Sequence, residues 1–182
     1  MSWKSSPQHY GSVAIAIHWV SAAAILLQFG LGVAAANAGD AGAQAGLLRA
    51  HVVLGIFVVT LTLIRLGWWL IDRRPAALAG LPSWQALSER AVRVLLYLLI
   101  LLLGASGLAV LALSGAADIL FAGAGRALPD FTRLPPMAAH IGAAAALLGL
   151  AALHIVAALY HHFWRRDGLL GRMWKARAGA PS

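Results

Sequence analysis

The sequence has no cysteine among its 182 residues. This absence excludes a disulfide framework, a thiolate metal site and an iron–sulfur cluster held by cysteine. It also excludes the C-x-x-C-H motif, so any haem would be held without covalent attachment to the chain. Metal or redox chemistry in this protein must therefore use other side chains.

Charged residues are scarce too, at 11% of the chain against roughly a quarter in soluble proteins. Hydrophobic residues make up 61%, and the mean hydropathy is +0.80, which is an excess that needs a bilayer to cover it. The net charge of +8 would suit nucleic acid in a soluble protein, but no basic helix or aromatic–basic motif supports that interpretation. We therefore expect membrane lipid, and no nucleic acid, as a partner.

Four long apolar runs cover residues of about 13–36, 50–71, 94–117 and 137–163. Each reaches the roughly 20 residues that a helix needs to cross the hydrocarbon core. Only helix suits such spans, because lipid cannot satisfy open backbone groups. The sequence predicts an all-α fold, an integral membrane four-helix bundle forming a single transmembrane domain over residues 1–182. The first run exceeds the 7–15 apolar residues of a signal peptide, so we expect it to remain as a helix. Residues 37–44 are expected to link the first two helices, and residues 83–93 could form a short interfacial helical turn that leads into the membrane.

The cations are distributed unequally between the connections. Ten lie in the N-terminal segment, the second connection and the C-terminal segment, whereas three lie in the first and third connections. By the positive-inside rule, both termini are expected to be cytoplasmic. The ten are Lys4, Arg73, Arg74, Arg90, Arg93, Arg165, Arg166, Arg172, Lys175 and Arg177, and the three are Arg49, Arg126 and Arg133.

Four of the seven histidines fall inside the predicted spans, where ionisable residues are rare and usually functional: His18, His51, His140 and His154. A single histidine there could simply bond two helices together. However, His154 follows His140 by 14 residues, which returns it to within about 40° of the same helix face and about 21 Å further along the axis. His51 has the expected depth of His140, and His18 that of His154. Two such pairs suit bis-histidine haem. Zinc is disfavoured, because its ligands must converge on one point.

Other residues of the spans have two interpretations each. Arg65 lies 14 residues after His51 and could bind a haem propionate, or could extend its guanidinium to the cytoplasmic interface. His161 shares a face with His154 and could line a cavity at the inner haem, whereas His162 would meet headgroups or solvent. Small residues could make room for a macrocycle or only for close helix packing. These are Ala22, Gly55, Ala144 and Ala158, four residues after each histidine, and Gly104 and Gly107 of the third run. The aromatic residues at the span ends are typical of an interfacial belt: Trp68, Trp69, Phe163 and Trp164.

Several segments match a known family: IAIHWV around His18, RAHVVLG around His51 with Arg65 following, and residues 138–164, which end in HHFW. The chain resembles the bacterial cytochrome b561 family of the four-helix, two-haem kind. The resemblance implies haem b between His51 and His140 on the outer side, haem b between His18 and His154 on the inner side, and a multi-pass protein of the bacterial inner membrane. It also implies electron exchange with ubiquinone. One departure is the stretch SERAVRVLLYLL, which lacks the extra histidines of relatives.

The family's superoxide oxidase type implies an enzyme, a superoxide:ubiquinone oxidoreductase. His161 is our candidate for a quinone contact, because reduced quinone takes up two protons and histidine titrates in a useful range. The alternatives are an electron-transfer subunit that serves a periplasmic dehydrogenase, and a haem sensor or carrier without turnover. Short outer loops favour the enzyme, since they offer little surface to a large partner. Arg49, Arg126 and Arg133 could attract superoxide toward the outer haem, or could bind lipid phosphates. A protein redox partner and a homo-oligomer both remain open.

Overall fold

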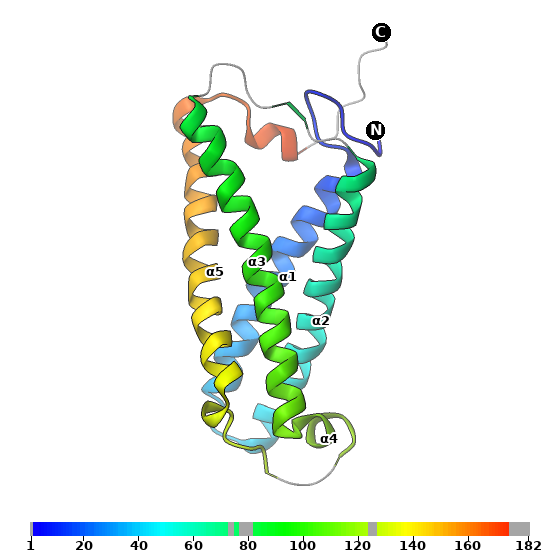
Figure 1. The fold of residues 1–182 in the computed structure, drawn as a ribbon, viewed down its shortest axis with the longest axis vertical. Helices are drawn as coiled ribbons and strands as arrows, with labels where there is room; N and C mark the ends of the chain where they lie inside the picture. Colours follow the sequence, from blue (N-terminus) through cyan, green and yellow to red (C-terminus); the bar gives the residue numbers. More distant parts are fainter. Residues whose placement is uncertain (1, 73–74, 77–81, 124–126, 175–182) are drawn as a thin grey trace. The chain divides into compact units, whose positions relative to one another are not determined.

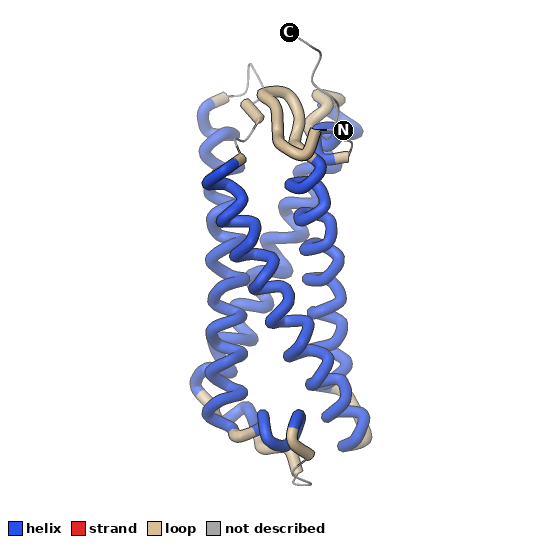
Figure 2. The backbone as a smooth tube through the Cα atoms, turned by 90° about the vertical axis from the view of Figure 1, so that its right-hand side faces the viewer, coloured by secondary structure: helices blue, strands red, loops and turns tan. Residues whose placement is uncertain are grey.

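The computed structural model describes residues 2–72, 75–76, 82–123 and 127–174, and all regular structure in these residues is helical, without strands (Figure 2). Four long helices dominate the fold (Figure 1): α1 (Ser12–Ala36), α2 (Ala41–Ile71), α3 (Ser83–Ser114) and α5 (Pro135–Tyr160). Each is long and apolar enough to cross a membrane, and the fourth candidate span continues to Arg165. The prediction of an all-α protein with four spans is therefore confirmed, whereas the cytoplasmic placement of the termini stays a prediction.

The predicted start of α2 was wrong by nine residues, because the helix begins at Ala41 rather than near residue 50. Asp40 makes the early start possible. Its side chain accepts a hydrogen bond from the backbone N–H of Ala43 at 2.7 Å, and its backbone carbonyl accepts one from Gln44 at 2.9 Å. Such a cap satisfies N–H groups that have no partner at a helix start. Residues 41–44 are thus helical and not part of the connection.

α3 also differs from its predicted range of 94–117 at both ends. It begins at Ser83, so residues 83–93 are helical, as expected, and continue without a break into the span. It ends at Ser114, because Gly115 adopts φ 66°, a left-handed conformation that suits glycine and stops the helix. A short helix, α4 (Ala116–Phe121), follows.

The end of α5 changes helical form. A π-helix, η2 (His161–Arg165), continues from Tyr160 and ends at Arg166, whose φ of 51° is left-handed. A 3-10 helix, η3 (Leu170–Met173), follows, and another, η1 (Phe131–Arg133), precedes α5. A non-glycine residue in the left-handed region is uncommon, so this turn is a special feature of the chain.

Packing divides the chain into two compact units. The terminal unit consists of Met1–Ser21, Leu61–Tyr97 and Leu148–Ser182, and the loop unit consists of Ala22–Thr60 and Leu98–Leu147. Each unit contains a segment of all four long helices. His18, Arg65, His154 and His161 lie in the terminal unit, and His51 and His140 lie in the loop unit.

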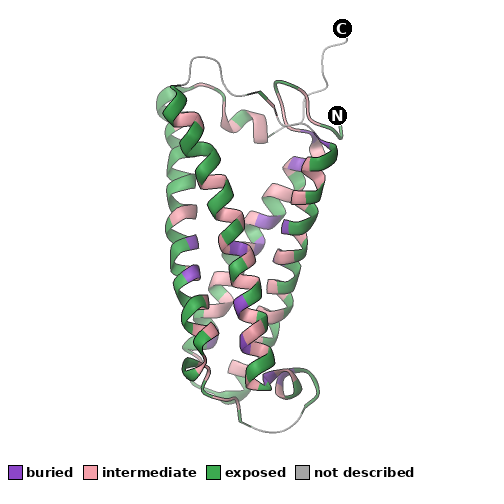
Figure 3. Ribbon diagram, viewed as in Figure 1, coloured by how far each residue is buried: buried purple, intermediate pink, exposed green. Residues whose placement is uncertain are grey.

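Large apolar side chains are exposed along the helices, and few residues are buried (Figure 3). Leu70 is 88% exposed and Leu87 is 69% exposed. Exposing such apolar side chains to water costs free energy, whereas exposing them to lipid does not. The small buried set of the loop unit includes Val58, Val110 and Leu147. This distribution fits helices that face lipid and bury little in their own interior.

Candidate haem sites

The loop unit brings the imidazole rings of His51 of α2 and His140 of α5 close together. Their ring centres are 6.1 Å apart, with the ring planes at 68°. An imidazole nitrogen binds a metal at about 2 Å, and the ring centre lies roughly 1 Å behind that nitrogen, so two axial imidazoles on one iron have centres roughly 6 Å apart. The observed spacing would let both imidazoles bind a single metal ion.

Hydrogen bonds with residues of α3 fix the orientation of the His140 ring. Its Nδ1 lies 3.1 Å from the carbonyl oxygen of Leu103 and 3.1 Å from Oγ of Ser106. A carbonyl can only accept, so Nδ1 carries the proton and donates it to Leu103. The Nε2 lone pair is then available to a metal, which is the arrangement that usually orients ligating histidines.

Glycines of the neighbouring helices lie against both rings. A Cβ added at Gly32 of α1 would lie 3.1 Å from Cε1 of His51, and one added at Gly107 of α3 would lie 3.2 Å from Cε1 of His140. Of these two, only Gly107 was singled out in the sequence. A side chain at either position would push the imidazole, so the glycines allow the rings to lie where they do.

Gly55 and Gly104 serve other neighbours. A Cβ at Gly55 would come within 2.9 Å of Nε2 of Gln28, and a Cβ at Gly104 within 2.5 Å of Cγ2 of Val59. The space beside these two glycines is therefore filled by side chains of the chain itself. Of the two interpretations of these glycines, this arrangement supports close packing between helices.

Among the described residues, three histidines have a buried Nδ1 without a hydrogen-bond partner: His9, His18 and His51. Buried polar atoms are nearly always bonded, so each exception calls for an explanation. The backbone carbonyl of His51 does accept a hydrogen bond from Gln28 at 2.9 Å, which ties α1 to α2 beside the ring. The spacing of His51 and His140, the available Nε2 of His140 and the glycines beside both rings together fit haem iron.

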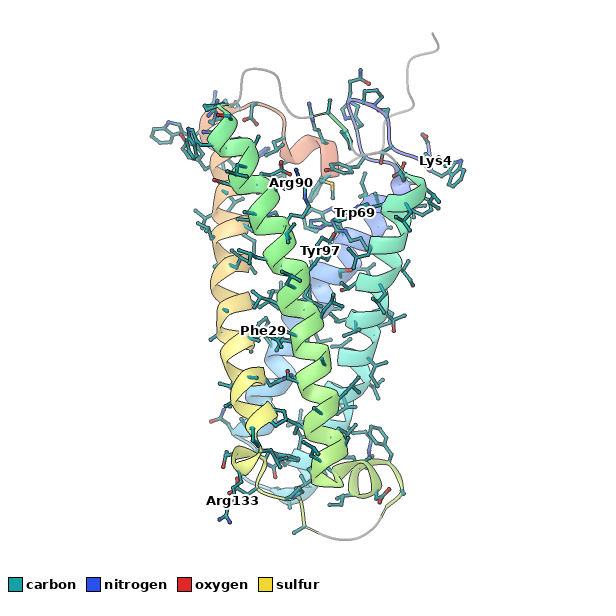
Figure 4. All side chains as sticks on the ribbon, viewed as in Figure 1. Lys4, Phe29, Trp69, Arg90, Tyr97 and Arg133 are labelled. Carbon is teal, nitrogen blue, oxygen red and sulfur yellow. The ribbon has the colours of Figure 1, made fainter. Side chains whose placement is uncertain are left out.

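In the terminal unit, His18 of α1 and His154 of α5 lie close enough to interact electrostatically, and Arg65 of α2 interacts with both. His18 is half-buried, and His154 is exposed. The guanidinium of Arg65 lies 5.9 Å from the ring centre of Tyr97, which packs edge-on against Trp69 at 4.8 Å (Figure 4).

No carboxylate pairs with Arg65 within the described ranges. A half-buried guanidinium without an acidic partner favours an external anion, and a haem propionate is one. The structure thus brings together the three residues that the sequence assigned to this end, namely His18, Arg65 and His154.

His161 lies in the π-helix and contacts Asp167, which sequence reasoning missed. Its Nδ1 is 2.5 Å from Oδ2 of Asp167, and Nε of Arg165 is 3.8 Å from the same oxygen. Burial alone would raise the pKa of Asp167, but hydrogen bonds from His161 and Leu169 and the charges of His161 and Arg165 outweigh it, so its pKa lies below the usual value. His162 is exposed, as expected for a headgroup contact.

The cations predicted to attract superoxide are Arg49, Arg126 and Arg133, and the two that the structure describes, Arg49 and Arg133, have different partners. Nε of Arg49 donates to the backbone carbonyl of Leu120 at 2.6 Å and so ties α2 to α4. Arg133 pairs with Asp130 at 3.0 Å, and its side chain is 83% exposed at the end of the loop unit (Figure 4). Arg126 lies outside the described residues.

Known proteins of one family match almost the whole chain. The prokaryotic cytochrome b561 family profile matches residues 9–176. Cytochrome b561 homolog 2 of Escherichia coli (strain K12) is 30% identical over 183 aligned residues, which cover 95% of each chain. Cytochrome b562 of Cereibacter sphaeroides is 31% identical over 173 residues, which cover 92% of this chain and 96% of that protein. No solved structure matches the chain significantly. The chain therefore belongs to the prokaryotic cytochrome b561 family and is a membrane cytochrome b of electron transfer, as the sequence resemblance predicted.

Proposed function

We propose that the chain binds two non-covalent haem b groups, one between His51 and His140 and one between His18 and His154. The observation that carries this proposal is the 6.1 Å spacing of the His51 and His140 rings. Two further observations support it. His140 Nδ1 donates a hydrogen bond to the backbone carbonyl of Leu103, and Gly32 and Gly107 leave space for the two imidazole rings. Bound haem would supply one-electron redox chemistry, with its potential set by the ligands and by their hydrogen bonds.

The protein's own residues prepare the two sites in different ways. In the loop unit, Leu103 and Ser106 select the tautomer of His140, so that Nε2 faces the iron. In the terminal unit, Arg65 would neutralise a propionate and hold the macrocycle between His18 and His154. Such a charge-assisted bond is worth roughly twice a neutral one.

The proposed reaction takes electrons from superoxide at the periplasmic face and delivers them to ubiquinone. Two superoxide anions each lose one electron and leave as dioxygen. One ubiquinone gains these two electrons and two protons and becomes ubiquinol. The connections of the loop unit would face the periplasm and both termini the cytoplasm, because the cations are concentrated near the termini.

Compact connections in the loop unit support a small substrate over a large protein partner. Only residues 37–40 separate α1 from α2, and α4 and η1 occupy much of the connection from α3 to α5. Arg49 would attract the anion, and His161 would contact ubiquinone at the other end of the spans. A histidine suits that role because it gains and loses a proton near neutral pH.

Stopped-flow spectroscopy of the haem-loaded protein tests this function. Superoxide should reduce the haem, and added ubiquinone should then reoxidise it. If superoxide fails to reduce the haem while a dehydrogenase from native membranes does so, the protein is an electron-transfer subunit instead. Haem that neither superoxide nor a membrane donor reduces would point to a sensor or carrier.

A further inference from the structure

The chain beyond α5 folds back on itself. The π-helix His161–Arg165 widens the last turn, and Arg166 and Gly168 then adopt positive φ values of 51° and 74°. Short π-helical turns are frequent at functional sites, and left-handed non-glycine residues persist only where surrounding contacts hold them. Here the fold-back places Asp167 beside His161, which a regular helix would not do.

The carboxylate of Asp167 is held from several sides. Oδ2 lies 2.5 Å from Nδ1 of His161 and 3.8 Å from Nε of Arg165, and Oδ1 accepts the backbone N–H of Leu169 at 3.2 Å. The side chains of His161 and Asp167 are only 18% and 20% exposed. A carboxylate on Nδ1 keeps the proton on that nitrogen, so Nε2 becomes the atom that exchanges protons.

Aromatic side chains around this pair face outward. Tyr160 is 51% exposed, Phe163 is 67% exposed and Trp164 is 81% exposed. Such residues mark the level where a membrane meets water. A quinone dissolved in lipid brings its ring to this level, where protons from water are also available.

We propose that Asp167 is a positioning residue for His161 and that the two form the proton-transfer site for a quinone reduced at this end of the chain. This inference rests on the proposed function. The His161 imidazolium donates its Nε2 proton to a quinone oxygen and remains as the neutral ring, with Nδ1–H on Asp167. Water then reprotonates Nε2 for the second transfer, while the cytochrome supplies both electrons.

The test uses the full-length, haem-loaded protein in lipid nanodiscs with ubiquinone-1 as the probe. Haem is reduced anaerobically, and its reoxidation is followed over a range of quinone concentrations. Asp167→Asn should lower the reoxidation rate at saturating quinone by about 10- to 100-fold, as expected for impaired acid–base catalysis. The quinone concentration that gives half of the maximal rate should stay within about twofold of the wild-type value. Asp167→Glu should recover part of the rate. Asp118→Asn, the same chemical change on α4, is the matched control and should have no effect.

A spectroscopic measurement separates positioning from a general structural role. In protein labelled with ¹⁵N-histidine, Asp167→Asn should shift His161 away from the Nδ1–H tautomer, while the haem absorption spectrum stays unchanged. If Asp167→Asn impairs haem loading, the reoxidation rate and the His161 tautomer are measured in the Asp167→Glu variant instead, and these two results decide the question.

The outcomes distinguish this inference from the proposed function. A slow His161→Ala variant beside a normal Asp167→Asn variant would overturn the role of Asp167 and leave quinone reduction in place. Normal reoxidation in both variants would overturn the proton-transfer site at His161. Wild-type haem that ubiquinone-1 does not oxidise would overturn the proposed function itself, and this inference with it.

Discussion

In the loop unit, His51 and His140 lie against Gly32 and Gly107, and neutral hydrogen bonds hold the ring of His140. In the terminal unit, by contrast, His18 and His154 lie near the guanidinium of Arg65. The first site is shaped by close packing and the second by charge. A packed neutral site can hold a flat group, whereas a charged site can also bind the anionic substituents of such a group.

The contrast extends to the rest of the terminal unit, where ionic and polar bonds fasten the ends of the helices. Asp72, only 7% exposed, accepts hydrogen bonds from the backbone and side chain of Ser5 at 2.9 and 2.7 Å and from Trp68 at 3.0 Å. Trp19 of α1 donates to the backbone of Met173 at 2.8 Å. The N-terminal segment and the segment after α5 are therefore both anchored, and the latter is the one that presents Asp167 to His161.

Replacing any of the four histidines proposed to ligate haem should have the largest effect, and this effect should be confined to the unit that contains the histidine. Replacing His51 or His140 with alanine should abolish the haem of the loop unit, and replacing His18 or His154 should abolish that of the terminal unit, because a bis-histidine site without one ligand becomes five-coordinate or empty. Redox titration of each purified variant measures which component disappears. Identical residual spectra and potentials in the His51 and His18 variants would contradict the pairing.

Filling the glycine space should weaken only the loop unit. Gly32→Ala or Gly107→Ala places a Cβ within 3.1 or 3.2 Å of a histidine ring, so the ring must shift by a few tenths of an ångström. We expect a cost of about 1 kcal/mol, which is roughly a fivefold loss of haem affinity at that site. Transfer of haem to apomyoglobin measures this loss separately for each spectral component.

The matched control for Gly32 is Gly30→Ala, because a Cβ at this position on the same helix meets nothing within 4 Å. It should leave both haems as tightly bound as in the wild type. Equal effects of Gly30→Ala and Gly32→Ala would show that the ring contact does not position His51.

The histidine positions illustrate how much could be predicted from the sequence. The 14-residue spacing of His140 and His154 along one helix predicted two levels of histidine, and the expected depths of His51 and His18 predicted their partners. Both inferences work because helical geometry is regular inside a span. Gly32 could not be singled out, since its importance depends on which ring of another helix lies beside it. Asp167 was missed because the π-helix and the left-handed Arg166 break the helical period from which neighbours are inferred.

The ends of the spans were predicted less well than their centres. Apolar runs located all four helices, but the runs do not contain the residues that start or stop them. Asp40 starts α2 nine residues early through its cap, and Gly115 ends α3 through its left-handed backbone. Such effects depend on single polar or glycine residues outside the apolar pattern.

Electrostatic attraction of superoxide should have a smaller effect, confined to the loop unit. Arg49 has no acidic partner within the described ranges, whereas Arg133 is paired with Asp130. We therefore expect Arg49→Gln to slow haem reduction by superoxide about two- to fivefold at low salt, and Arg133→Gln to change it less. Arg49→Lys keeps the charge and should stay near the wild-type rate.

Stopped-flow measurements at several salt concentrations test this expectation. The wild-type rate should fall as salt rises, since charges are screened over about 8–10 Å near physiological ionic strength. The triple variant of Arg49, Arg126 and Arg133 to Gln should flatten that dependence. A rate that responds to neither salt nor these substitutions would contradict electrostatic attraction.

Acid should loosen the terminal unit slightly through Asp167. Its pKa lies below the usual value of 3.8 in the folded protein, so its contribution to stability is complete above that pH and is lost as the pH falls from 3.8 through the lower folded-state value. Hydrogen exchange of the backbone N–H of Leu169, which donates to Asp167, should therefore accelerate below this range, after correction for the intrinsic pH dependence. Asp167→Asn should remove the transition, and an unchanged transition in that variant would assign it to another group.

The number of haem groups per polypeptide tests the central claim most directly. Haem released by acid–acetone from purified, fully loaded protein can be quantified as the pyridine haemochrome and divided by the protein concentration from amino-acid analysis. The two histidine pairs predict two haems per chain, and non-covalent ligation in a protein without cysteine predicts that all of the haem is extracted. A ratio of one, or haem that stays with the protein after extraction, would contradict the account.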